Sequence, residues 1–248
     1  MTAPLLSLEG LKVTLGGRDV ITDATVTLHA GEMLLLLGRS GTGKSVLIKA
    51  ALGFLPVAAG RVLLHGVPRD VDELRRAVTL VHQAPALLPE LDVLHNVLNP
   101  LRWRETMGET LSLVRARTAL ELVGAAHLAN AGTAILSAGE QKLVALARAV
   151  AVSSEALLLD EPTTGLDVGA ARRVGEACAR IAAKGTALLV VTHDVAPFAA
   201  HANRVALLHG GKVLETGALP GALQAPSPAM RQFLDAARVG PLSSLDGP

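Results

Sequence analysis

The chain has 248 residues, of which 50% are hydrophobic, and its 23 basic and 22 acidic residues leave a formal net charge of +1. Without a charge excess or a basic run the chain lacks the electrostatic signature of a nucleic-acid-binding protein, and its single cysteine, Cys178, excludes an internal disulfide framework. The mean hydropathy is high at +0.42, but no apolar run approaches the roughly 18 residues that span a bilayer, so we expect a soluble α/β domain that relies on a partner or a membrane surface.

The first third of the chain predicts strands and helices in alternation. Leu6–Leu15 and residues 24–29 are typical of antiparallel strands, with Gly16-Gly17 as the turn between them. Met33–Leu37 is a short apolar run, typical of a strand that is buried on both faces. The next predicted elements are a helix after residue 45 that ends at Pro56, a strand at 61–65, a helix at Val71–Ala77 with Asp70 as its cap, and a strand at 78–82.

The middle of the chain has a different character. Residues 84–101 are rich in leucine and proline, and the segments after them predict helices without strands between them. Glu109–Val123 is an amphipathic helix that ends at Gly124, and another helix begins at Ser137 and runs to about Val152. We therefore expect an inserted helical subdomain at about residues 84–152. The remaining predicted elements are a strand at 156–159, a helix at 168–184, a strand at 186–191, a helix at 195–201, a hairpin of 204–209 with 212–215, and helices at Gly221–Gln224 and Pro228–Ala236.

The strongest motif lies between the Met33–Leu37 strand and the helix that follows it. There the sequence fits G-x-x-x-x-G-K-[ST], the phosphate-binding loop. At such a junction glycines let the backbone wrap a phosphate, and the amide hydrogens and positive end of the helix face an anion. The Lys44 ammonium would reach the β- and γ-phosphates, and the Ser45 hydroxyl would bind Mg²⁺. The predicted nucleoside triphosphate site comprises Gly38, Arg39, Ser40, Gly41, Thr42, Gly43, Lys44, Ser45 and the following Val46.

A pair of acidic residues follows the apolar run at 156–159. Asp160, at the end of a buried strand, can hold Mg²⁺ beside the phosphate loop. Glu161 can polarise the water that attacks the γ-phosphate. The alternative is a surface turn that begins with two acids, but the phosphate loop elsewhere in the chain favours the catalytic interpretation.

A further element is Leu136-Ser137-Ala138-Gly139-Glu140 at the start of a predicted helix. Ser137 and Glu140 have the spacing of a capping box, which is a purely structural device. A helix N-terminus with a serine and a glycine is also a good clamp for a γ-phosphate. Both interpretations can hold together.

Six motifs, in this order, resemble the ATP-binding cassette (ABC) family across nearly the whole chain: the phosphate loop, Gln83, residues 136–140, residues 159–161, residues 165–167 and His193. The resemblance implies an α/β fold, the ABC type of P-loop NTPase, with a mixed RecA-like core, an antiparallel β subdomain and an inserted helical subdomain. It also implies ATP and Mg²⁺ as cofactors, and a head-to-tail dimer of two copies that encloses two ATP molecules.

The resemblance also gives roles to single residues. Gln83 would sense Mg²⁺ and the attacking water, and His193 would contact the γ-phosphate and orient Glu161. Asp167 would link the two sites of the dimer. The residues that would face the γ-phosphate of the partner protomer are Ser137, Gly139 and Glu140.

The chain departs from the family pattern in three places. Ala138 and Glu140 stand where the signature usually has glycine and glutamine, which we expect to slow or weaken closure of the dimer. Leu143 stands where the signature helix usually carries a basic residue. Leu15 stands where an aromatic residue usually stacks on adenine, so we expect loose recognition of the base.

A narrower resemblance links Val46 and residues 222–235, with Gly240-Pro241 beyond them, to the Mla-type cassette ATPases. It implies phospholipid transport with a multi-spanning membrane permease and a protein carrying an MCE domain, by a cytoplasmic subunit on the inner face of the cell membrane. Residues 1–225 would form the ATPase domain and residues 226–248 a C-terminal interaction segment. The alternative for that segment is an ordinary amphipathic end helix.

Two other functions stay open at this point. Residues 87–91 also suit a lipoprotein-release or export ATPase, and a non-transport cassette such as an assembly scaffold would share the six motifs. Within the transport interpretation, residues 84–97 follow Gln83 and carry leucines too apolar for a solvated loop. We therefore predict that they form the docking surface for the permease.

Overall fold

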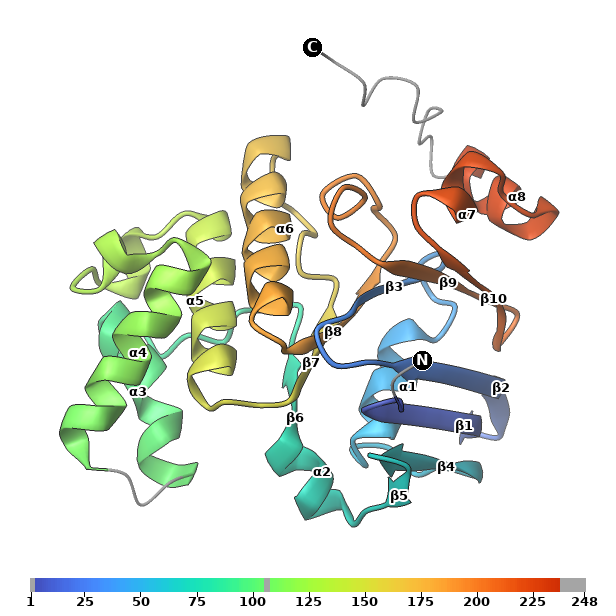
Figure 1. Cartoon of the computed structure of the whole chain (residues 1–248), viewed down its shortest axis with the longest axis horizontal. Coiled ribbons are helices and arrows are strands. Elements are labelled where there is room, and N and C mark those ends of the chain that lie inside the picture. Colours follow the sequence, from blue (N-terminus) through green and yellow to red (C-terminus); the bar gives the residue numbers. More distant parts are fainter. Residues whose placement is uncertain (1–2, 105–107, 237–248) are drawn as a thin grey trace.

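The computed structural model describes residues 3–104 and 108–236, which form a ten-stranded sheet surrounded by helices (Figure 1). The strand order is β5-β4-β1-β2-β10-β9-β3-β8-β7-β6. Antiparallel pairing joins β1 to β2 and to β4, and parallel pairing joins β9, β3, β8, β7 and β6 in turn. One sheet therefore contains an antiparallel half and a parallel half.

The antiparallel half comes from the first part of the chain. Strands β1 (Leu6–Leu15) and β2 (Arg18–Leu28) meet at the predicted Gly16-Gly17 turn, where both glycines have positive φ. β2 begins earlier than residue 24 because the pairs Val13 with Ile21 and Leu15 with Arg18 extend the ladder to the turn. β4 (Ala59–Leu64) pairs with β1, and β5 (Val67–Pro68) pairs with β4.

The parallel half contains the strands that the sequence shows as continuous apolar runs. Every residue of β3 (Met33–Leu37), β7 (Ala156–Asp160) and β8 (Ala187–Thr192) is buried, because helices cover both faces of these strands. The edge strand β6 (Val78–Val81) pairs with β7. The remaining strands, β9 (Arg204–His209) and β10 (Lys212–Ala218), form the predicted hairpin about Gly210-Gly211.

Most helices begin and end where local signals place them. α2 (Val71–Ala77) begins at Asp70, whose carboxylate accepts the amide hydrogen of Glu73, and α4 (Glu109–Val123) ends at Gly124 in the left-handed conformation. Between β6 and β7 the chain forms α3 (Val93–Arg104), α4 and α5 (Ala138–Ala151), which lie together at one end of the molecule (Figure 1). The other α-helices of the described residues are α1 (Lys44–Ala51), α6 (Val168–Ala183), α7 (Gly221–Gln224) and α8 (Pro228–Ala236), and two short 3₁₀ helices, η1 (Ala126–Leu128) and η2 (Thr133–Ile135), lie between α4 and α5.

Strand β3 separates two apolar cores. Met33, Leu35 and Leu37 join the core that contains α5 and α6. Leu34 and Leu36 join the core that contains α1 and the antiparallel strands. This division follows from the alternation of side chains along a strand, and it places the carboxyl end of β3, where the phosphate loop begins, at the boundary between both cores.

The predicted helix at residues 195–201 is wrong. The Ala199 amide donates to the Val195 carbonyl and the Ala202 amide to the Phe198 carbonyl, which closes two successive turns. Val195 and Phe198 are buried in this arrangement. A segment this short has little helical stability of its own. The two turns bury the same apolar side chains that a helix would have buried.

The chain after β10 packs against the rest of the molecule. Met230 and Phe233 of α8 are 0% and 6% exposed and join the same core as Leu223. Residues 237–248, the remainder of the predicted C-terminal segment, lie outside the described residues. Within residues 3–104 and 108–236, no helix combines the length and the apolar character that a membrane crossing requires.

Candidate functional site

The phosphate loop joins β3 to α1, as predicted. Gly43 is the N-cap of α1 with a φ of 98°, and Gly41 has a φ of 80°, a region that side-chain-bearing residues rarely adopt. A Cβ on Gly38 would lie 2.8 Å from the Leu208 carbonyl oxygen and from the Thr42 hydroxyl. The Thr42 hydroxyl itself donates to the carbonyl of Arg39 at 2.8 Å. The glycines therefore fit a loop whose amides can close around a phosphate.

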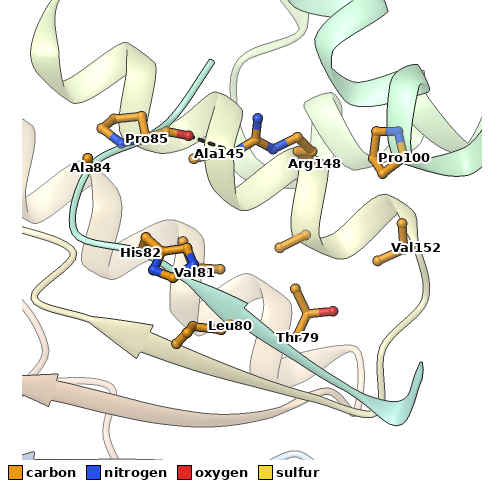
Figure 2. A pocket seen from close by; sticks show the side chains of 11 residues that line it. Thr79, Leu80, Val81, His82, Ala84, Pro85, Pro100, Ala145, Arg148 and Val152 are labelled. Atoms are coloured by element: carbon orange, nitrogen blue, oxygen red, sulfur yellow. Dashed lines mark hydrogen bonds between the residues drawn. The ribbon is translucent and has the colours of Figure 1, made fainter. Parts of the chain in front are cut away.

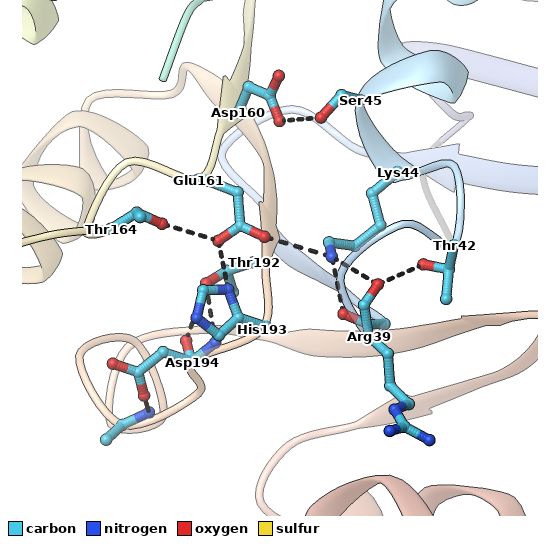
Figure 3. Close-up of polar contacts among 12 residues, drawn as sticks. Arg39, Thr42, Lys44, Ser45, Asp160, Glu161, Thr164, Thr192, His193 and Asp194 are labelled. Atoms are coloured by element: carbon cyan, nitrogen blue, oxygen red, sulfur yellow. Dashed lines mark hydrogen bonds and ion pairs between the residues drawn. The ribbon is translucent and has the colours of Figure 1, made fainter. Parts of the chain in front are cut away.

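The Lys44 ammonium lies at the centre of this loop. Its Nζ donates to the carbonyls of Gly38 at 2.7 Å and Arg39 at 3.2 Å, and lies 3.2 Å from Oε1 of Glu161 (Figure 3). The lysine side chain is only 5% exposed. A buried cation in a cradle of amides is a strong site for a triphosphate.

Ser45 and Asp160 meet across the start of α1 and the end of β7. The Ser45 hydroxyl donates to Oδ1 of Asp160 at 2.7 Å, and Asp160 is 5% exposed. Ser45 and Gln83 line one cavity, which also contains Lys44. This set of hydroxyl, carboxylate and amide oxygens fits Mg²⁺, which prefers oxygen ligands and takes the rest of its shell from phosphates and water. Among the residues described, no three His, Cys, Asp or Glu side chains gather as a metal site.

Glu161 holds an unusual backbone conformation directly after β7. Its φ is +47°, and its amide donates to the Val191 carbonyl at 2.9 Å. Its Oε2 lies 2.8 Å from Nδ1 of His193 and accepts the Thr164 hydroxyl at 3.2 Å (Figure 3). A left-handed conformation is costly for a non-glycine residue, and here it directs the carboxylate at the phosphate loop.

The cavity beside Lys44, about 350 Å³ in volume, is lined mostly by predicted site residues. Leu15 does not line it; Val20 of β2 does, and its methyl group would lie 3.0 Å from a Cβ on Gly43. Sequence reasoning missed Val20 because its position depends on the register of β2. The lining residues are Val20, Ser40, Gly41, Gly43, Lys44, Ser45, Val46, Gln83, Glu161, Thr164 and His193.

A second residue that sequence reasoning missed is Lys142 on α5. It is 7% exposed, and its Nζ donates to the main-chain carbonyl of Gln83. Burial lowers the pKa of this ammonium, while the nearby carboxylates of Asp160 and Glu161 act in the opposite direction. A buried ammonium near the carboxylates of Asp160 and Glu161 is a signal that only the three-dimensional structure reveals.

The predicted residues Ser137, Gly139 and Glu140 lie together at the start of α5. Ser137 is the N-cap of α5 and forms the predicted capping box with Glu140. Oε2 of Glu140 accepts both the Ser137 amide at 2.8 Å and its hydroxyl at 2.7 Å, and these two contacts, the hydroxyl first, lower the pKa of Glu140. A Cβ on Gly139 would lie 2.8 Å from the Cβ of Ala170 on α6. None of these three residues lines the cavity around Lys44.

The loop between a strand and a helix carries a buried lysine and a serine that bonds to an aspartate. These features define a P-loop nucleoside triphosphatase. The fold and the motifs agree with the comparisons. Residues 21–164 match the family described as ABC transporter. The chain therefore belongs to the ABC transporter family, as an ATPase cassette with the predicted α/β fold.

Relatives and solved structures cover most of the chain. The Fe(3+) ions import ATP-binding protein FbpC of Streptomyces coelicolor is 39% identical over 92% of this chain, which spans 66% of that relative's length. The phosphonates import ATP-binding protein PhnC 2 of Nostoc sp. is 35% identical over 81% of this chain and 86% of its own length. The structure of cbiO1 from Clostridium perfringens, part of an ABC transporter complex, is 26% identical with a TM-score of 0.83 over 94% of this chain and 95% of that one.

Proposed function

We propose that this chain is the ATP-hydrolysing subunit of a membrane transporter, with Glu161 as the group that polarises the attacking water. The observation that carries this proposal is that the Glu161 carboxylate faces Lys44 with one oxygen and His193 with the other. A water between Glu161 and a γ-phosphate held by Lys44 would give its proton to the carboxylate as its oxygen attacks phosphorus and ADP leaves.

The other residues of the cavity support this step. Lys44 would exchange its contacts with Gly38 and Arg39 for the β- and γ-phosphates. Ser45, Asp160 and Gln83 would hold Mg²⁺, which when bound neutralises phosphate charge. His193, already paired with Glu161, would fix the rotamer of the carboxylate and contact the γ-phosphate.

We infer that Ser137, Gly139 and Glu140 serve the site of a second copy in a head-to-tail dimer. They lie at the start of α5, whose free amides can bind an anion, but outside the cavity around Lys44. The dimeric structure of a bacterial ABC transporter cassette, 27% identical with a TM-score of 0.75 over 87% of this chain and 99% of that one, supports this inference. Asp167, which caps α6 at the Ala170 amide, would link the two sites.

We propose residues 84–97 as the docking surface for a membrane permease. A cavity of about 240 Å³ lies between β6, the segment after it and α5, lined by Ala84, Pro85 and Arg148 among others (Figure 2). Arg148 donates to the carbonyls of Pro85 at 2.6 Å and Ala86 at 2.7 Å, and its burial lowers its pKa. Leu88, further along the segment, is 39% exposed.

The same segment is well ordered by its own contacts. The Asn96 side chain, 0% exposed, accepts the Leu88 amide at 2.7 Å and donates to the carbonyls of Leu88, Leu91 and Asp92. An apolar side chain on a segment held in this way presents a fixed surface to a partner. Because the segment follows Gln83, contact with a permease would be linked to the nucleotide site.

Different observations support two classes of transported substrate, phospholipids and small solutes. The resemblance of residues 222–235 to Mla-type cassettes supports phospholipid transport with a protein carrying an MCE domain. The names of the relatives, which concern import of Fe(3+) ions, phosphonates, hemin and cobalt, favour uptake of a small solute. In either case we propose a cytoplasmic subunit on the inner face of the cell membrane, with residues 1–225 as the ATPase domain, 84–152 as its helical subdomain and 226–248 as an interaction segment.

The decisive experiment is purification of the tagged chain from native membranes with the Glu161→Gln substitution and ATP, so that the ATP-bound complex is retained. A permease together with a protein carrying an MCE domain would support phospholipid transport. A permease together with a soluble solute-binding protein would support uptake of a small solute. Recovery without any membrane protein would refute the transporter proposal and leave a scaffold function.

A further inference from the structure

Lys142 is a buried cation whose role the catalytic scheme above does not explain. It lies on α5, a little more than one helical turn beyond Ser137, and its side chain points away from solvent toward Gln83. Its ammonium donates to the carbonyl of Gln83, and Gln83 lines the nucleotide cavity. The lysine therefore holds the main chain of a residue that is proposed to hold Mg²⁺.

Burying this ammonium is costly, and an apolar side chain of similar length would avoid the cost. Removing a charged amine from water without full compensation costs several kcal/mol. The contacts that offset this cost are the Gln83 carbonyl and the charges of Asp160 and Glu161. Gln83 and Glu161 line the nucleotide cavity and Asp160 accepts the Ser45 hydroxyl beside it, so the groups that act on the Lys142 ammonium are those of the nucleotide site.

We infer that Lys142 is a positioning residue that fixes the main chain at Gln83 and so aims the Gln83 side chain at the metal and the attacking water. The role of Gln83 in this inference rests on the proposed function. The tether, which is the hydrogen bond from Lys142 to the Gln83 carbonyl, rests on geometry alone. Because the same helix begins at Ser137, the tether also joins the γ-phosphate clamp of one site to Gln83 of the other. A shift of α5 when the dimer closes would move Gln83 directly.

The first test measures the tether without nucleotide. The ¹³C resonance of the Gln83 carbonyl, which responds to the hydrogen bond that the oxygen accepts, is compared in the wild-type chain, Lys142→Met, Lys142→Arg and the control Lys184→Met, which removes an exposed lysine at the end of α6. Lys142→Met should move this resonance, while hydrogen–deuterium exchange should show that α5 stays protected. Lys142→Arg should restore most of the wild-type position of the resonance, and Lys184→Met should change nothing.

The second test asks whether Lys142 acts through Gln83. Lys142→Met should lower kcat about 10- to 100-fold with KM for ATP changed by less than about threefold. In a Gln83→Ala background, where the carbonyl remains but the side chain is gone, Lys142→Met should cause no further loss.

Three results would overturn the inference. An unchanged Gln83 carbonyl resonance in Lys142→Met would show that Lys142 does not hold Gln83 in solution. Increased exchange throughout α5 would make Lys142 a support of the helix. Losses of kcat that multiply in the double variant would show that Lys142 acts independently of Gln83. If the wild-type chain does not hydrolyse ATP, the proposed function fails, but the Gln83 carbonyl resonance still decides the tether.

Discussion

The two oxygens of the Glu161 carboxylate have different partners: Oε1 lies 3.2 Å from the Lys44 ammonium, and Oε2 lies 2.8 Å from Nδ1 of His193. Glu161, the proposed proton acceptor, therefore contacts both Lys44, the proposed phosphate ligand, and His193. The carboxylate charge is needed for proton abstraction, whereas its shape is enough to keep the neighbouring side chains in place. The two functions can therefore be separated by substitution.

Glu161→Gln should abolish steady-state ATP hydrolysis and retain ATP binding. The amide keeps the shape of the carboxylate but cannot take a proton, so turnover should fall by at least about 10²-fold on the scale of lost general-base catalysis. Turnover assays test the first part, and chromatography with ATP should show a shift to dimer. Glu176→Gln, on α6 beside Arg172, is the control. Unchanged turnover in Glu161→Gln would remove Glu161 from its proposed role.

Recognition of the base should be loose. Val20 lines the nucleotide cavity and cannot stack as an aromatic ring does, so the base should lose a contact worth about 1–3 kcal/mol. ATP, GTP and inorganic triphosphate with Mg²⁺ should bind with similar dissociation constants in calorimetry. Val20→Tyr, at the wall of the cavity, should tighten ATP and GTP but not triphosphate, and Leu214→Tyr, at an exposed position on β10, should tighten none of them. A wild-type preference for ATP above about 100-fold would mean that another residue covers the base.

Leu88→Asp should uncouple the ATPase from its membrane partner. The substitution puts a charge on the proposed docking surface, while the Asn96 contacts that hold the segment involve only the main chain of Leu88. Basal ATPase of the isolated chain should stay within about twofold, as for most surface substitutions. Stimulation by the permease should be lost. Leu111→Asp, 49% exposed on α4, should retain stimulation, and normal stimulation in Leu88→Asp would disprove the docking surface.

The Phe233 side chain should contribute to the stability of the whole cassette. Phe233 is 6% exposed within the core that contains Leu223, so Phe233→Ala should lower the free energy of unfolding by about 3 kcal/mol. Leu234→Ala, at a half-buried position, should cost less than half as much. Denaturant titration measures both changes. ATP binding should persist in the folded fraction because the phosphate contacts lie upstream. An unchanged unfolding midpoint would indicate that α8 detaches in solution.

The pH dependence of stability should include a contribution from Glu140. Its contacts with Ser137 hold the pKa of Glu140 below the ordinary value in the folded state. Its stabilising effect is therefore present above the ordinary carboxyl pKa and is lost as pH falls through the lower, folded pKa. Unfolding titrations from about pH 6 to about pH 3 should show a shallower acid slope in Glu140→Gln than in wild type. Equal slopes would mean that the capping box is not charged in solution.

Local signals predicted much of the fold. Asp70 and Gly124 mark helix ends because capping is a property of neighbouring residues, and the phosphate loop is recognisable because its chemistry lies within one short segment. The missed features depend on distant partners. Asn96 and Lys142 look like ordinary polar residues of a helix until the fold buries them. Val20 enters the cavity only through the register of β2, and residues 195–201 satisfy a helical pattern with two turns.

The alternation of β3 between two cores has a consequence for unfolding. Met33, Leu35 and Leu37 belong to one core, while Leu34 and Leu36 belong to the other. Neither core can unfold without exposing to solvent one face of β3, the strand that precedes the phosphate loop. Heat or denaturant should therefore unfold both cores in one cooperative transition. A nucleotide bound at the end of β3 would shift that single transition for the whole cassette, since any ligand that binds only the folded form stabilises all of it.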